Sequence, residues 1–141
     1  MNRISLDQAN CIVTEVFRKG AELKLKALTV VVLDPGGHVI ACQRQDGAST
    51  MRFQIATGKA SGALAIGVSS RKIGEMAAER PSFVAALGAI APHGVIPAAG
   101  GVIVVGEGGI IGAVGVTGDT SDNDEVCALA GIAAAGLRAQ G

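Results

Sequence analysis

Hydrophobic and polar positions change period along this chain, and the changes predict where helices and strands lie. Ser5 followed by Gln8 forms a capping-box pattern, and apolar residues then recur at helical spacing to about Leu25. Two apolar runs follow at residues 28–34 and 38–44, separated by a Pro-Gly-Gly turn that is typical of a β-hairpin. Alternate side chains of a strand face opposite sides, so the second run places Arg44 at its far end, on the same face as Cys42.

The remaining segments continue this alternation of helices and strands. A helical pattern covers residues 50–67, and shorter ones run from Ser69 or Ser70 to about residue 79 and from Pro81 to about residue 88. Short apolar runs at 95–96, 102–105 and 110–116 predict strands, and Thr120 or Ser121 caps a last helix. The expected order is α-β-β-α-α-β-β-β-α, with the two short helical patterns between residues 69 and 88 counted as one element. Hairpin-length links favour an antiparallel sheet flanked by helices, an α+β fold.

Small residues gather on one face of the strand at 110–116. Ala113, Gly115 and the following Thr117 share this face, which a helix or a flat ligand could approach closely.

Composition narrows the class of protein. The 141 residues predict one domain, 1–141, and twelve basic residues balance twelve acidic ones, so nothing in the net charge attracts nucleic acid or an anionic membrane. The chain has no Trp and no Tyr to stack on bases. It shows no signal core and no apolar run that could span a bilayer. Three widely spaced cysteines suggest reduced thiols, so we expect a cytoplasmic protein.

Known phosphate and metal motifs are not matched. The Walker A and dinucleotide patterns fail on their glycines, and the acidic run at 119–124 lacks the glycine and the final glutamate of a calcium loop. His38 and Cys42 are about 13 Å apart on one strand, too far to share a metal ion. We therefore expect no metal site. A single axial histidine, His38 or His93, would nevertheless suffice for haem, although either ring could equally be a solvated turn residue.

A charged cluster is the main candidate for ligand chemistry. Arg44 and Asp46 follow the second strand, and Lys59 stands among small residues of the helix at 50–67. Arg44 and Asp46 form either an ordinary surface ion pair, worth about 0–1 kcal/mol, or a carboxylate clamp in which Asp46 orients the Arg44 fork. Tight packing around Lys59 could hold an amine near the sheet end, which modestly favours the clamp.

Several segments together carry a resemblance to a known family. They are Asp34-Pro35-Gly36-Gly37-His38-Val39-Ile40-Ala41, Arg44-Gln45-Asp46-Gly47-Ala48, Ile55-Ala56 with Lys59-Ala60, Pro97 with Gly100-Gly101-Val102, Ile111-Gly112-Ala113-Val114-Gly115-Val116-Thr117-Gly118, and Asp124-Glu125 with Ala128. In this order they resemble the GlcG/HbpS-like haem-binding family, which includes the carboxy-terminal domain of PduO-type proteins.

The resemblance implies a fold, an assembly and a ligand. It implies a five-stranded antiparallel sheet in a profilin-like arrangement, a homo-oligomer, and haem binding or haem-linked sensing in some members. Some relatives supply a haem ligand from the first helix, where this chain has no histidine; here His38 or His93 would take that place. The ligand-binding residues it suggests are Arg44, Asp46, Lys59, Gly100, Gly101, Thr117 and Gly118.

Three functions remain open at this point. The first is a small-molecule binding module, with haem or a related tetrapyrrole as its ligand. The second is an enzyme acting on a small carboxylated metabolite, in which Arg44 binds the carboxylate and Asp46 or Lys59 transfers a proton. The third is a purely structural subunit of an oligomer.

Overall fold

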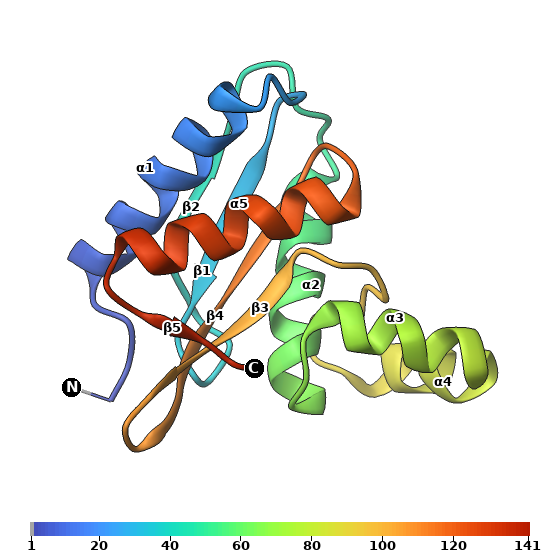
Figure 1. Cartoon of the computed structure of the whole chain (residues 1–141). Helices are drawn as coiled ribbons and strands as arrows, with labels where there is room; N and C mark the ends of the chain where they lie inside the picture. Colours follow the sequence, from blue (N-terminus) through green and yellow to red (C-terminus); the bar gives the residue numbers. More distant parts are fainter. Residues whose placement is uncertain (1) are drawn as a thin grey trace.

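The computed structural model describes residues 2–141 (Figure 1). Within this range there are five helices and five strands, and they follow one another along the chain as α1 (Leu6–Glu22), β1 (Thr29–Leu33), β2 (Val39–Arg44), α2 (Arg52–Ile66), α3 (Ser70–Glu79), α4 (Pro81–Ile90), β3 (Gly101–Gly106), β4 (Gly109–Thr117), α5 (Ser121–Ala134) and β5 (Arg138–Ala139).

The strands form one antiparallel sheet in the order β2-β1-β4-β3-β5. This confirms the α+β fold with a five-stranded antiparallel sheet. The strand expected at residues 95–96 is wrong, because Val95 and Ile96 pack instead against glycines of α2. A Cβ on Gly58 would lie 2.7 Å from Ile96 Cγ1, and one on Gly62 would lie 3.1 Å from Val95 Cα. The fifth strand is the short β5 at the other end of the chain.

Helices cover both faces of the sheet (Figure 1). On one face α1 and α5 pack together over the larger core, which includes Ile12, Val16 and Ile132. On the other face α2 packs over β1, β3 and β4, where a smaller core contains Val31 and Ala60. The pair α3–α4 extends to one side of this layer. Because β2 lies outside the area that α2 covers, its α2-facing residues remain partly open to solvent.

The predicted helix starts are confirmed for α1 and α5. Ser5 and Gln8 form the expected capping box, and the Thr120 hydroxyl accepts a hydrogen bond from the Asn123 N–H. The first turn of α2 has no side-chain cap, because Met51 occupies the N-cap position. The Arg52 N–H donates instead to the Ser49 carbonyl, and the helix dipole leaves a positive end of α2 near the sheet.

A helix, rather than a ligand, occupies the small-residue face of β4. A Cβ on Gly115 would lie only 2.1 Å from the Ala56 carbonyl oxygen of α2. The absence of a side chain at this position is what lets the helix lie so close to the strand.

Candidate functional site

The polar residues of interest gather where β1 begins and β2 and β4 end. In the sheet, Thr29 of β1 is paired on one side with Arg44 of β2 and on the other with Thr117 of β4. Residues directly paired across antiparallel strands point to the same face, and adjacent strands are about 4.8 Å apart. Arg44, Thr29 and Thr117 therefore form a row on the α2 side of the sheet.

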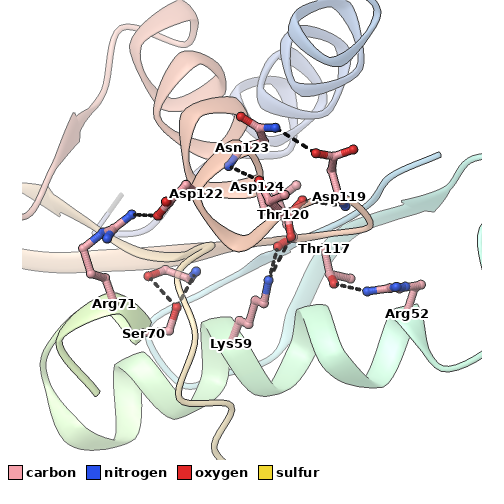
Figure 2. A network of polar contacts seen from close by, with 12 residues as sticks. Arg52, Lys59, Ser70, Arg71, Thr117, Asp119, Thr120, Asp122, Asn123 and Asp124 are labelled. Carbon is pink, nitrogen blue, oxygen red and sulfur yellow. Dashed lines mark hydrogen bonds and ion pairs between the residues drawn. The ribbon is translucent and has the colours of Figure 1, made fainter. Parts of the chain in front are cut away.

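Arg52, which the sequence interpretation missed, lies over this row. Its Nη1 donates a hydrogen bond to Thr117 Oγ1 at 2.9 Å (Figure 2). Its Nε donates a second hydrogen bond to Ser49 Oγ at 3.2 Å. The signal that could have found it is its spacing: Arg52 is two helical turns before Lys59 and shares its face of α2.

Lys59 is buried at the centre of a polar network (Figure 2). Its Nζ lies 3.1 Å from Asp124 Oδ2 and donates a second hydrogen bond to the Val116 carbonyl at 3.0 Å. Asp124 is equally buried, and its other carboxylate oxygen accepts the Asp119 N–H. The pair joins α2 to the first turn of α5 across the end of β4.

Burial and neighbouring charges act against each other on Lys59. Burial lowers the pKa of its ammonium, the ion pair with Asp124 raises it, and the positive charge of Arg52 lowers it further, so that the pKa is below its usual value. Within the described residues, Lys59 thus shares its surroundings with a second cation but pairs with a single carboxylate.

The three glycines suggested as ligand-binding residues are packed against protein atoms. A Cβ on Gly100 would lie 2.8 Å from Lys59 Nζ, one on Gly101 would lie 2.2 Å from the Lys59 carbonyl oxygen, and one on Gly118 would lie 2.2 Å from the Ala27 carbonyl oxygen. All three are buried. Their lack of a side chain lets Lys59 reach Asp124 and lets the backbone at residue 118 pass close to that at residue 27.

The structure separates the charged cluster expected from the sequence. Arg44 and Asp46 are exposed and line a shallow hollow of about 540 Å³ together with Phe17 and Ala27, whereas Lys59 is buried in its pair with Asp124. Among residues 2–141 no ion pair joins Arg44 to Asp46. Among the suggested residues, Thr117 connects the two regions: it is paired with Thr29, the strand partner of Arg44, and it follows Val116, whose carbonyl accepts a hydrogen bond from Lys59.

His38 lies in the hairpin at the opposite end of β1 from this row, and His93 lies in the loop between α4 and β3. The His38 side chain is 82% exposed, and its Nδ1 lies 3.3 Å from Asp34 Oδ1. Partial burial raises the pKa of Asp34, but hydrogen bonds from the His38 and Gly36 N–H groups and the nearby imidazole lower it more, so the carboxyl is more acidic than usual. His93 is exposed in the loop after α4.

Neither the cysteines nor the acidic residues form a metal centre in the part of the chain that the structure describes. Cys11, Cys42 and Cys127 are free thiols, and burial raises the pKa of Cys42 and Cys127. None of the helices in residues 2–141 has the length and hydropathy needed to cross a bilayer.

Comparison with known proteins places the chain in a family. The family model described as haem-degrading protein HbpS-like matches residues 4–133, which is most of the sequence. The chain belongs to the HbpS-like family. No curated protein sequence matches this HbpS-like chain significantly.

Solved structures similar to this HbpS-like protein agree with the family match. Klebsiella pneumoniae ORFY is 27% identical, with a TM-score of 0.85 over 94% of this chain and 90% of that one. A double mutant of Streptomyces reticuli HbpS is 26% identical, with a TM-score of 0.80 over 93% of this chain and 86% of that one. The haem complex of PduOC is 19% identical, with a TM-score of 0.86 over 99% of both chains, a likeness that concerns the fold.

Proposed function

We propose that this HbpS-like protein is a small-molecule binding module whose ligand is haem or a related tetrapyrrole. Membership in the family supports a haem-related function, and PduOC, which shares the fold, was crystallised with haem. The proposal also includes self-association, because β2 is an edge strand and carries the half-exposed Val39 beside the turn of His38. Its three free cysteines favour the cytoplasm as its location.

The Asp34–His38 pair is the observation that carries the assignment of an axial ligand. Histidines that bind metal usually donate their second ring N–H to a carboxylate, which fixes the tautomer and leaves the other nitrogen for the metal. Asp34 is placed to accept from Nδ1 of His38, and the ring is exposed. The residues present therefore fit haem at His38 better than at His93, for which no carboxylate contact is found among residues 2–141.

The size of the hollow next to His38 argues for haem on the surface or between subunits. The turn before His38 and α2 enclose only about 160 Å³, lined by Gly36, Gly37 and Ser61 among others. Drug-sized ligands usually occupy about 300–1,000 Å³, so a porphyrin ring would not be enclosed here by one copy of the chain.

Haemin titration tests this proposal. We expect a saturable Soret shift with wild-type protein, its loss in His38→Ala, and little change in the matched variant His93→Ala. Light scattering on the same samples reports whether haemin changes the oligomeric state. A wild-type spectrum without a saturable shift, or a shift that survives His38→Ala unchanged, would contradict ligation by His38.

Catalysis on a carboxylated metabolite is the weaker candidate. Proton transfer needs a group that can reach the substrate, and Lys59 is buried between Asp124 and the Val116 carbonyl. Asp46 is exposed, and its carboxylate makes no side-chain hydrogen bond or ion pair with any of residues 2–141. The geometry around Arg44 favours binding of an anion over chemistry on it.

A further inference from the structure

Arg52 is held in place without being neutralised. Its two hydrogen-bond partners, Ser49 and Thr117, are uncharged hydroxyls. By contrast, the guanidinium groups of Arg18 and Arg71 each contact two carboxylates. A guanidinium fixed by neutral partners keeps its charge available for an anion, and its planar fork matches a carboxylate.

A second arginine, Arg44, forms no ion pair with any of residues 2–141 and lies across Thr29 from Arg52. The Arg52 side chain donates a hydrogen bond to Thr117. Thr117 lies opposite Thr29 on the neighbouring strand, and Thr29 lies opposite Arg44 on the next. With strands about 4.8 Å apart, the α-carbons of Arg44 and Thr117 are about 10 Å apart, so the long side chains of both arginines can reach the space above Thr29.

Between them lies a hydroxyl without a partner. Thr29 is fully buried, and its Oγ1 makes no hydrogen bond with any of residues 2–141. Buried hydroxyls normally have a partner, so this atom marks a place where an acceptor or donor is missing.

The surrounding charges also favour an anion. Lys59 pairs with the buried carboxylate of Asp124, whereas the neighbouring Arg52, whose positive charge lowers the pKa of Lys59, forms no ion pair with any of residues 2–141. Of the other carboxylates at this end of the sheet, Asp119 binds the Lys26 N–H and the Asn123 side chain, and Asp46 forms no ion pair with Arg44. The uncapped positive end of α2 begins at Arg52 itself.

We propose that Arg44 and Arg52 form a binding site for a small carboxylate, centred above Thr29. One carboxylate oxygen faces the two guanidinium groups, and the other accepts a hydrogen bond from the Thr29 hydroxyl. The ligand enters between the side chains of Arg44 and Arg52, and Arg44 is exposed to solvent. Arg44 follows His38 by six positions, so this site lies at the other end of β2 from His38 and does not depend on haem binding.

Calorimetric titration with acetate and succinate, at constant ionic strength, tests the site. We expect saturable binding to wild-type protein that weakens about 10-fold or more in Arg44→Gln, since it removes a charge-assisted hydrogen bond. Thr29→Val keeps the shape of the side chain and removes only its hydroxyl; we expect it to weaken binding while the protein remains folded. The matched control is Arg138→Gln, an exposed arginine on the opposite edge strand, which should bind like wild type.

Three results would overturn the proposal. They are no saturable binding of either carboxylate to wild-type protein, an equal loss of affinity in Arg138→Gln and Arg44→Gln, or a preference for inorganic phosphate over both carboxylates. Failure of the haem proposal would look different, because His38→Ala should leave carboxylate binding intact.

Discussion

Replacing Asp124 by Asn should destabilise this protein far more than any exposed charge substitution. The two oxygens of Asp124 have different donors, Lys59 Nζ for Oδ2 and the Asp119 N–H for Oδ1. An asparagine offers one oxygen and one NH₂ group, so either the Lys59 ammonium or the Asp119 N–H would face the NH₂ group instead of an acceptor. The substitution also leaves the Lys59 ammonium buried without a counterion.

The expected size of the effect follows from burial. The side chains of Lys59 and Asp124 are only 3% and 1% exposed, so water cannot replace the lost partner. Breaking a buried ion pair by removing one member typically costs about 3–5 kcal/mol in the free energy of unfolding. Because a domain of this kind is stable by about 5–15 kcal/mol in total, the loss is a large fraction of the stability.

Urea unfolding followed by circular dichroism measures the loss. With a slope of about 2 kcal/mol per molar urea, the midpoint should fall by about 2 M in Asp124→Asn. The matched control is Asp122→Asn, also in the first turn of α5 but 80% exposed in its pair with Arg71, which should cost at most about 1 kcal/mol.

A double substitution separates loss of the pair from loss of packing. In Lys59→Met with Asp124→Leu no charge is left buried, so we expect it to be more stable than Asp124→Asn. The reasoning is refuted if Asp124→Asn and Asp122→Asn lower the free energy of unfolding by the same small amount.

Two further predictions concern close packing and pH. Gly101→Ala should lower the free energy of unfolding by about 1–3 kcal/mol in urea melts, because its Cβ would lie 2.2 Å from the Lys59 carbonyl oxygen. The control Gly108→Ala should be nearly neutral, because its Cβ would have no atom within 4 Å. Equal effects of the two substitutions would contradict close packing at Gly101. Burial, with a further contribution from Asp124, raises the pKa of Cys127 to about 11 from 9.0. The stability that the protonated Cys127 thiol gives the folded state is therefore complete below pH 9 and is lost as the pH rises towards 11. The urea midpoint should therefore fall more between pH 9 and pH 11 for wild type than for Cys127→Ala.

Periodicity predicted the helices and most of the strands, because local sequence decides them. The capping box at Ser5 and the two-residue turn between β3 and β4 depend on residues close together in the chain. Val95 and Ile96 were misassigned because two apolar residues look the same in sequence whether they pair in a sheet or pack on a helix. Only the nearby glycines of α2 distinguish the two cases, and they are more than thirty residues away.

For the candidate site, the sequence identified Arg44, Lys59 and Thr117 but not how they are connected. Asp124 entered the sequence analysis only through the acidic run at 119–124 and the family segments, and nothing local links it to Lys59, which is 65 positions earlier. Arg52 was missed because it matches no motif, and only its position two helical turns before Lys59 places it on the same face of α2.

What the sequence by itself determined is the helices and most of the strands, their antiparallel arrangement and, through several dispersed segments, the HbpS-like family. What only the tertiary structure decided is which charges are neutralised. Lys59 meets Asp124 because the glycines at 100 and 101 let α2 approach the sheet, and the same arrangement leaves Arg44 and Arg52 without carboxylates. Charge pairing depends on distances between segments remote in sequence, and those distances are set only when the helices pack on the sheet.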